Sequence, residues 1–251
     1  MALELRDLSV GYGEHRVLEG VSWRISPGRF AALLGRNGSG KSTLLKAIGG
    51  HLPLAGGEVR VQGHDLRGAS ARERARRIGY LPQFHTPVFD FSVEDVVLTG
   101  RAAQVVILPG VVDRALAAQA LQRVGLTHLR QRAYSELSGG ERQLVMFARI
   151  LAQGPGLVLL DEPLAHLDLP NQTRLLRLIR ELTAEGMTVL AVVHDPNLAF
   201  LHADEIVFLL DGRLRRPAEG EPPWDPDLLA EVYGTPVEVV PFRDRALVVP
   251  R

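Results

Sequence analysis

Residues 35–43, Gly35-Arg36-Asn37-Gly38-Ser39-Gly40-Lys41-Ser42-Thr43, fit the pattern G-x-x-x-x-G-K-[ST] of a phosphate-binding loop. The apolar run Phe30-Ala31-Ala32-Leu33-Leu34 comes just before it and predicts a buried strand. Apolar residues at helical spacing follow from Ser42 to Ile48, and Gly49-Gly50 predicts the end of that helix. Strand, glycine loop and helix stand in the order that phosphate binding requires, so this stretch predicts an α/β fold.

The residue types of this loop suit a nucleoside triphosphate and a metal ion. Glycines let the backbone approach phosphate oxygens, and the N–H groups at the start of the helix favour an anion. We expect Lys41 to reach the β- and γ-phosphates and the Ser42 hydroxyl to ligate Mg²⁺. A glycine-rich turn with a chance lysine is the alternative, and both flanking segments argue against it.

Composition limits the classes of protein to consider. A chain of 251 residues suggests one large domain or two small ones, and 46% hydrophobic residues can build a core. Lys plus Arg and Asp plus Glu each number 29, so no bulk charge attracts nucleic acid or anionic lipid. The absence of cysteine excludes disulfides, iron–sulfur clusters and thiolate zinc sites. No apolar run approaches the ~20 residues of a membrane span and no signal peptide is evident, which predicts a soluble cytoplasmic protein.

The segments before residue 92 alternate between strands and helices. Residues 2–10 and 17–25 predict two strands, joined by a turn at Gly11-Tyr12-Gly13. Tyr12 between glycines can expose its ring to stack on a flat base, and ordinary packing is the competing interpretation. Two further strands are expected at 58–61 and from Ile78 towards Gln83.

Residues 92–153 predict a largely helical insertion. One helix is expected to start at Ser92 and another to run through 115–124, ended by Gly125. The apolar stretch 101–111 between them is either an exposed contact for a partner or a loop packed on the helices. Before the insertion, residues 70–77 predict a helix with four arginines, and we interpret it as a solvated face because no aromatic residues interleave as they do in nucleic-acid sites.

The string Leu137-Ser138-Gly139-Gly140-Glu141-Arg142-Gln143 predicts the start of a long helix. Ser138 suits the N-cap and Glu141 completes a capping box. The two glycines leave the first-turn N–H groups unobstructed, so this second helix N-terminus can hold an anion. A simple capped helix is the alternative, which would be preferred for an isolated S-x-x-E but not for the whole string.

The run Leu157-Val158-Leu159-Leu160-Asp161-Glu162-Pro163 predicts a buried parallel strand with two acids at its carboxyl end, where ligands bind in open α/β sheets. We expect Asp161 to hold Mg²⁺ and Glu162 to orient and deprotonate an attacking water. Residues 169–185 predict a helix and 188–193 a buried strand, after which His194 is expected to face the γ-phosphate. Residues 205–214 predict a hairpin with a D-G turn.

The phosphate loop, Leu137–Gln143 and Leu157–Glu162 occur in the order and spacing of ATP-binding cassette (ABC) ATPases, and the chain resembles that family from residue 2 to about 215. The resemblance implies a P-loop NTPase core with a mixed sheet, an N-terminal antiparallel β subdomain and a helical signature subdomain, within a domain spanning 1–215 with the insertion at about 92–153. Residues 216–251 then form a short C-terminal tail, with a helix near 226–233 and a hairpin, which can support a dimer.

The resemblance also implies roles for single residues. Tyr12 corresponds to the aromatic residue that stacks on adenine, and Gln83 to the glutamine that senses Mg²⁺ and the membrane partner. Asp168 matches the D-loop aspartate and His194 the switch histidine. Ala165 departs from the family, which often has a small hydroxyl residue there. The implied catalytic residues are Glu162, His194 and Gln83, the Mg²⁺ ligands Ser42, Gln83 and Asp161, and the ATP-binding residues Tyr12, Gly35, Asn37, Gly38, Ser39, Gly40, Lys41, Ser42, Thr43, Ser138, Gly139, Gly140, Asp161 and Asp168.

Within the family, the chain looks most like ATPases of importers for metal chelates: iron–siderophore, haem, cobalamin and molybdate. The cues are residues 165–168 followed by Asn171-Gln172, residues 194–199, and residues 228–234. The expected cofactors are ATP and Mg²⁺. The expected partners are a second copy, which completes an ATP sandwich through Ser138-Gly139-Gly140, two transmembrane permease subunits and, indirectly, a substrate-binding protein, with no nucleic acid. The expected place is the cytoplasmic face of the cell membrane.

Three other functions remain open at this point. An ABC ATPase could serve an importer for another substrate class, because the ATPase subunit does not touch the cargo. A soluble ABC ATPase of DNA repair or translation usually has two cassettes or long coiled-coil insertions, which this chain lacks. A nucleotide-binding regulator without hydrolysis is disfavoured by the presence of both Glu162 and His194.

Overall fold

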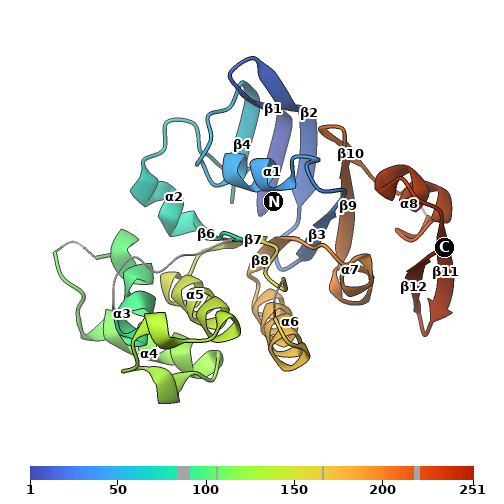
Figure 1. Ribbon diagram of the computed structural model, residues 1–251. Helices are drawn as coiled ribbons and strands as arrows, with labels where there is room; N and C mark the ends of the chain where they lie inside the picture. The colour runs from blue at the N-terminus through green and yellow to red at the C-terminus, as the bar shows by residue number, and fades with distance from the viewer. Residues whose placement is uncertain (84–90, 106, 166, 218–220) are drawn as a thin grey trace.

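The computed structural model describes residues 1–83, 91–105, 107–165, 167–217 and 221–251. A six-stranded mixed sheet forms its centre, in the order β10-β9-β3-β8-β7-β6 (Figure 1). The strands from β9 to β6 run parallel, and β10 pairs antiparallel with β9. Their bounds are β3 (Phe30–Leu34), β6 (Ile78–Leu81), β7 (Leu157–Asp161), β8 (Thr188–Val192), β9 (Glu205–Leu210) and β10 (Arg213–Arg215). The predicted α/β fold with a mixed sheet is confirmed.

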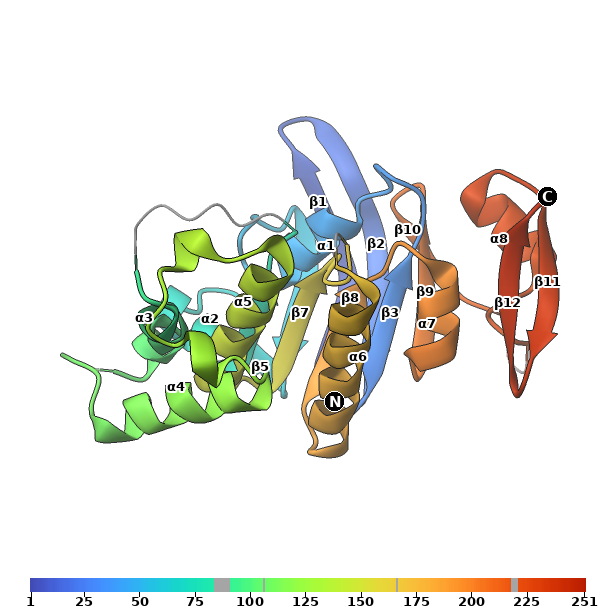
Figure 2. The same cartoon turned by 60° about the horizontal axis from the view of Figure 1, so that its bottom comes forward.

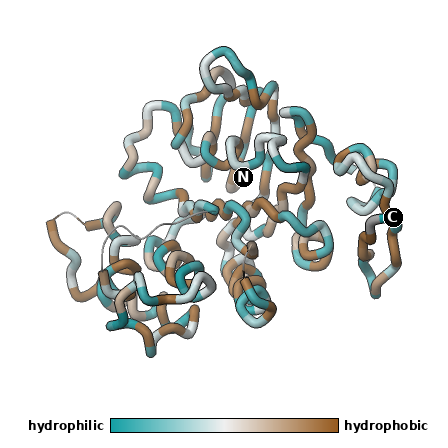
Figure 3. The backbone as a smooth tube through the Cα atoms, in the orientation of Figure 1, coloured by the Kyte–Doolittle hydropathy of each residue, from teal (hydrophilic) through white to brown (hydrophobic). Residues whose placement is uncertain are grey.

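The apolar runs of the sequence form the middle of this sheet. Every residue of β3, β7 and β8 is buried. Strands covered on both faces are apolar throughout instead of alternating, which is why these three could be recognised from the sequence. Figure 3 shows the trace of the central sheet as mostly hydrophobic. Because the strands are parallel, the segments that follow β3, β6, β7 and β8 meet at one edge.

A second, antiparallel sheet is built by the N-terminal part of the chain. It has the order β2-β1-β4-β5, with β1 (Leu3–Tyr12), β2 (His15–Ile25), β4 (Gly56–Val61) and β5 (His64–Asp65). Strand β1 extends through Tyr12, so the predicted turn at Gly11-Tyr12-Gly13 is misplaced. The cause is a tighter hairpin: Tyr12 pairs with His15, and only two residues, of which Gly13 has a φ of 59°, make the turn.

Helices fill the chain between β6 and β7. They are α3 (Val93–Leu98), η1 (Thr99–Ala103), α4 (Val111–Arg123), η2 (Thr127–Leu129), η3 (Tyr134–Glu136) and α5 (Gly139–Gln153), with η marking 3₁₀ helices. Figures 1 and 2 show this group beside the β6 edge of the sheet. Ser92 caps α3 as expected. Helix α4 starts earlier than its apolar residues predict, because the Gly110 N–H donates to the Asp113 carboxylate at 3.0 Å and fixes the first turn.

The apolar stretch 101–111 is partly exposed. Ile107 and Leu108 are 87% and 80% exposed, and Val111 and Val112 at the start of α4 are exposed as well. The interpretation of a loop packed on the helices is therefore wrong for these side chains. A contact for a partner stays a prediction, and residue 106 lies outside the described part of the chain.

The arginine-rich helix α2 (Ala71–Arg77) connects the helical group to the rest of the protein. Arg72 Nε donates to the Ala103 carbonyl at 2.8 Å, and Arg76 Nε donates to the same oxygen at 3.1 Å. Arg74 Nη1 donates to the Gly50 carbonyl at 3.2 Å. The prediction of a solvated face is thus incomplete, because these guanidinium groups bind backbone carbonyls that sequence spacing cannot reveal.

Of the remaining helices, the first follows β3 and the others come after β7. They are α1 (Lys41–Ile48), α6 (Leu169–Ala184), α7 (Pro196–His202) and α8 (Pro226–Tyr233), and the chain ends in the hairpin β11 (Val237–Phe242) and β12 (Arg245–Pro250). The amide of Asn197 on α7 bonds both the N–H and the carbonyl of Val248, at 2.7 and 3.1 Å, which anchors the hairpin. In the part of the chain that the structure describes, no helix has the length and apolarity to cross a bilayer.

Candidate functional site

The loop between β3 and α1 has a backbone that glycine permits. Gly35, Gly38 and Gly40 have φ angles of 146°, 80° and 102°. A Cβ on Gly35 would overlap the Leu209 carbonyl oxygen, and one on Gly40 would lie 2.9 Å from Val17 Cγ1. Both the conformation and the close approach therefore require glycine, which is the physical reason for the predicted spacing.

Lys41 lies under this loop. Its side chain is buried, and Nζ donates to the carbonyls of Gly35 and Arg36, each at 2.8 Å. Burial lowers the pKa of Lys41, and the charges of Glu162 and Asp161 oppose that shift. Next to it, Ser39 Oγ is buried without a hydrogen-bond partner among the described residues. An ammonium that binds neutral carbonyls beside an unpaired hydroxyl fits the binding of an anion in the loop.

Ser42 and Asp161 form the second contact of the site. Ser42 Oγ donates to Asp161 Oδ1 at 3.0 Å, which joins the start of α1 to the end of β7. Asp161 is only 2% exposed, and this burial raises its pKa, against the opposing effect of the Ser42 hydrogen bond. A hydroxyl and a carboxylate at this distance fit Mg²⁺, which prefers hard oxygen ligands.

Glu162 and Gln83 form the third contact. Gln83 Nε2 donates to Glu162 Oε2 at 2.7 Å, so the ends of β6 and β7 meet. Glu162 has a φ of 51°, in the left-handed region that non-glycine residues seldom adopt, and its N–H donates to the Val192 carbonyl at 3.2 Å. Such strain is concentrated at functional sites. The predicted base is therefore held in a fixed direction by both its backbone and its side chain.

Tyr80 is a site residue that the sequence analysis missed. Its hydroxyl donates to Asp161 Oδ2 at 3.5 Å. Burial raises the pKa of Tyr80, so the phenol stays protonated and can donate. The tyrosine belongs to an ordinary strand sequence, and only the parallel register of β6 on β7, with Tyr80 opposite Leu159, brings it near the acid. No sequence signal would have identified it.

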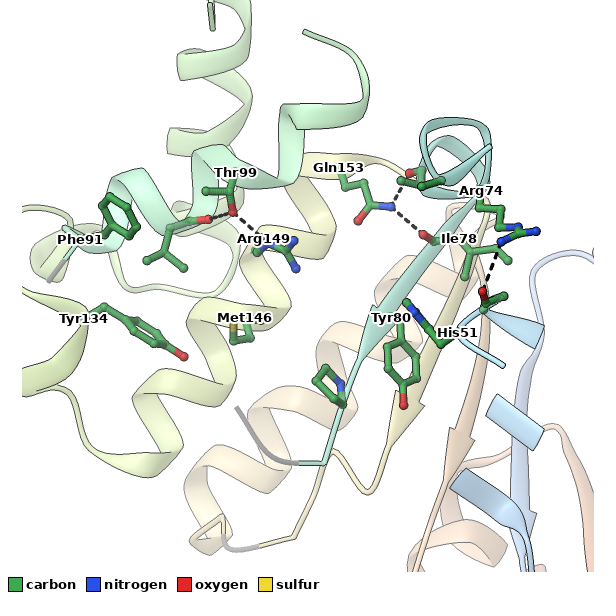
Figure 4. A pocket seen from close by; sticks show the side chains of 16 residues that line it. His51, Arg74, Ile78, Tyr80, Phe91, Thr99, Tyr134, Met146, Arg149 and Gln153 are labelled. Carbon is green, nitrogen blue, oxygen red and sulfur yellow. Dashed lines mark hydrogen bonds between the residues drawn. The ribbon is translucent and has the colours of Figure 1, made fainter. Parts of the chain in front are cut away.

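A groove of about 610 Å³ lies between the helical group and the sheet (Figure 4). Figure 4 shows Thr99 of η1 and Met146 and Arg149 of α5 on one side, and His51 and Tyr80 on the other. The wall is mixed in character, with Phe91, Tyr134 and Met146 as apolar members and Arg74 and Arg149 as cationic ones. The groove is separate from the phosphate loop, and Tyr80 belongs to its wall.

The predicted cap of α5 is confirmed. The Ser138 N–H donates to Glu141 Oε2 at 2.8 Å, and the Glu141 N–H donates to Ser138 Oγ at 3.3 Å. A Cβ on Gly139 would meet nothing within 4 Å, whereas one on Gly140 would lie 2.9 Å from Asn171 Nδ2. Gly139 thus leaves the N-terminus of the helix accessible. At Gly140, a side chain would also clash with Asn171 of α6.

Four other predicted residues are described by their exposure or by their local hydrogen bonds. Tyr12 is 50% exposed at the end of β1, so its ring is accessible for stacking. Asp168 is the N-cap of α6 and accepts from the Asn171 N–H at 3.2 Å, a structural task that the family resemblance did not imply. His194 is exposed after β8, and Asn37 is exposed in the loop. Residue 166, between Ala165 and Leu167, lies outside the described residues.

The chain therefore brings the residues of the phosphate-loop side into contact, but it does not bring the signature string to them. The structure brings Lys41, Ser42, Asp161, Glu162 and Gln83 together at the carboxyl edge of the sheet. In the described chain, the side-chain hydrogen bonds of Ser138 join it to Glu141 and do not reach that edge.

Comparisons with known proteins identify the family of this chain. A family model described as ABC transporter matches residues 18–165. The hemin import ATP-binding protein HmuV of Bordetella pertussis is 43% identical over 252 residues, which cover 96% of this chain and 95% of that protein. The protein of the same name from Streptomyces coelicolor is 44% identical, over 96% of this chain and 87% of its own length.

Solved structures give the same result for the fold. A chain from a metal-chelate type ABC transporter in an inward-facing conformation superposes with a TM-score of 0.85 at 31% identity, covering 100% of this chain and 97% of that one. A bacterial ABC transporter cassette solved as a dimer superposes with a TM-score of 0.76 at 30% identity, over 85% of this chain and 97% of that one.

Proposed function

Since this chain belongs to the ABC transporter family of ATP-binding proteins, we propose that it is the ATP-hydrolysing subunit of a metal-chelate importer whose cargo is hemin. The ATPase assignment rests on two hydrogen bonds at one edge of the sheet, between Ser42 and Asp161 and between Gln83 and Glu162. The cargo is supported by two relatives above 40% identity that are named hemin import proteins.

The phosphate loop would bind the nucleotide. Lys41 would exchange its carbonyl partners for the β- and γ-phosphates, while the open backbone of the loop and the start of α1 bind the phosphate oxygens. The exposed ring of Tyr12 would stack on adenine. Ser42 and Asp161, together with Gln83, would hold Mg²⁺, which supplies positive charge against the phosphates.

Glu162 would act as the general base of hydrolysis. Its carboxylate oxygen accepts from Gln83 at 2.7 Å, which directs it along the carboxyl edge of the sheet, and it would take the proton of the attacking water. His194, exposed after the neighbouring strand β8, would contact the same phosphate. Gln83 would connect the two sides, because it follows Tyr80 and Pro82 of the groove wall and donates to the proposed base.

The second half of the site would come from another copy of the chain. The open end of α5 at Ser138 and Gly139 would bind the γ-phosphate held by the partner subunit, and Asp168 at the start of α6 would contribute to the same shared site. ATP then bridges two copies, and its differential affinity for the closed dimer sets the population of that state. Hydrolysis removes the bridge, and two permease subunits, one seated in the groove of each copy near Tyr80 and Gln83, would move with the opening dimer. The protein would then lie on the cytoplasmic face of the membrane, with a substrate-binding protein as indirect partner.

Growth of the source organism tests the cargo. A strain lacking this gene and complemented with the parent gene should grow on hemin as its only iron source, and the strain carrying Glu162→Gln should not. Both strains should grow equally on ferric citrate and should take up cobalamin equally. Loss of growth on a ferric siderophore instead of hemin would overturn the assignment of hemin as the cargo, without affecting the ATPase assignment. Phosphate release by the purified protein tests the ATPase assignment separately.

A further inference from the structure

Tyr80 lies at the boundary between the groove and the metal-binding edge. Its ring lines the groove beside the imidazole of His51, with the ring centroids 5.0 Å apart and the planes at 42° (Figure 4). Its hydroxyl, at the far end of the same rigid ring, donates to Asp161 Oδ2 at 3.5 Å. One side chain therefore touches both the groove wall and the acid proposed to hold Mg²⁺.

Asp161 depends on such partners for its orientation. Its two carboxylate oxygens have different donors: Oδ1 accepts from Ser42 at 3.0 Å and Oδ2 from Tyr80. Rotation of a carboxyl group about its last bond is soft, so hydrogen bonds select its direction. At 2% exposure the group has little contact with water, and each protein donor has a larger share in fixing it.

We infer that Tyr80 is a positioning residue that orients the Asp161 carboxylate for Mg²⁺ and transmits contacts at the groove wall, through His51, to that carboxylate. The inference rests on the proposed role of Asp161 in metal binding. It does not depend on which membrane protein occupies the groove, or on the cargo.

Metal affinity in the isolated protein tests the first half. Mn²⁺ replaces Mg²⁺ as a paramagnetic probe, and its binding in the presence of ADP is followed by electron paramagnetic resonance. Tyr80→Phe removes only the hydroxyl, and should weaken Mn²⁺ binding about fivefold, while ADP affinity measured by calorimetry in EDTA stays unchanged. Tyr233→Phe, a matched loss of one buried hydroxyl in α8, should match the parent. Equal Mn²⁺ affinity in Tyr80→Phe and the parent would overturn the inference.

A double-mutant cycle tests the second half. His51→Ala removes the ring beside Tyr80 and should weaken Mn²⁺ binding about twofold, whereas His202→Ala, a half-buried histidine on α7, should not. The double variant His51→Ala/Tyr80→Phe should bind Mn²⁺ as weakly as Tyr80→Phe alone, because the effect of His51 passes through the Tyr80 hydroxyl. Additive losses of Mn²⁺ affinity in the double variant would refute the link to the groove. An unchanged Mn²⁺ affinity in His51→Ala would refute it as well. If the parent binds no Mn²⁺ with ADP, the proposed metal site itself is wrong, a result distinct from equal binding by parent and variant.

Discussion

The phosphate-loop half of the site and the signature half differ in where the hydrogen-bond partners of their polar side chains lie. On the phosphate-loop side, Lys41, Ser42 and Gln83 each donate to a group of the same chain, across separate elements of the sheet edge. On the signature side, Ser138 bonds only within the first turn of its own helix among the described residues, and a Cβ on Gly139 would face open space.

This difference separates two functions that one ATPase must perform. The phosphate-loop side is organised before any partner arrives, so a single copy should bind nucleotide. The signature side has a capped helix end that favours an anion, and a Cβ on Gly139 would meet none of the described atoms within 4 Å, so we expect its ligand to come from another molecule. We therefore expect nucleotide binding of the monomer and hydrolysis of the pair.

Replacing the base should have the largest effect. Glu162→Gln keeps the shape of the side chain but removes its ability to take a proton, so phosphate release should fall by about a thousandfold or more, within the range of general-base losses. ATP binding should remain, and light scattering should show an ATP-dependent dimer that the parent forms only transiently. Hydrolysis at the parental rate would show that Glu162 is not the base, and a monomer with ATP bound would contradict the shared site.

Replacing the loop lysine should have the next largest effect. It should weaken ATP binding and not only slow turnover. Lys41→Ala removes charge-assisted contacts to two phosphates, so the dissociation constant for ATP by calorimetry should rise about a hundredfold. Lys46→Ala is the matched control, because the chain has only these two lysines and Lys46 is exposed on the same helix. An unchanged dissociation constant in Lys41→Ala would refute the assigned role.

A substitution at the accessible N-terminus of α5 should affect hydrolysis without affecting ATP binding. Gly139→Glu adds a negative charge where the partner's γ-phosphate is proposed to bind, and its Cβ meets nothing within 4 Å in the folded chain. We expect ATPase activity to fall at least about tenfold, while ATP affinity of the monomer stays the same and thermal stability does not fall, since an acid favours a helix N-terminus. Weakened ATP binding by the monomer would contradict the division between the two halves.

The sequence predicted well those parts of the fold that have local signals. Continuous apolar runs identified β3, β7 and β8, and the S-x-x-E pattern identified the cap of α5, because burial and capping are encoded within a few residues. The turn at Gly11 to Gly13 was misplaced, since a hairpin's register depends on the partner strand and not on glycines alone.

The contacts between distant elements were beyond the reach of the sequence. The approach of Tyr80 to Asp161, the bond from Gln83 to Glu162 and the contact of Gly140 with Asn171 depend on strand register and helix packing, which no spacing along the chain reveals. The motifs did indicate which residue types belong to the site. The partners of those residues required the three-dimensional structure.

The smallest effect compares two identical caps, one at the site and one away from it. Ser138 with Glu141 on α5, and Ser70 with Glu73 on α2, form the same capping box. Removing either hydroxyl should cost about 1 kcal/mol, which lowers the melting temperature by about 2–4 °C in a chain of this size. Only Ser138→Ala should also lower ATPase activity, and equal activities in the two variants would place Ser138 outside the shared site.

The pH dependence of that stability loss follows from Glu141. Hydrogen bonds from the Ser138 N–H, and next from its hydroxyl, lower the pKa of Glu141 below 4.5. Because the folded-state pKa is the lower one, the carboxylate stabilises the native protein above the unfolded pKa, and this contribution is lost as the pH falls through the folded-state value. The difference in melting temperature between the parent and Ser138→Ala should therefore be constant near pH 7 and become smaller below about pH 4.5. A difference that grows on acidification, measured by calorimetry in both variants, would mean that the Ser138 hydroxyl does not donate to the ionised Glu141.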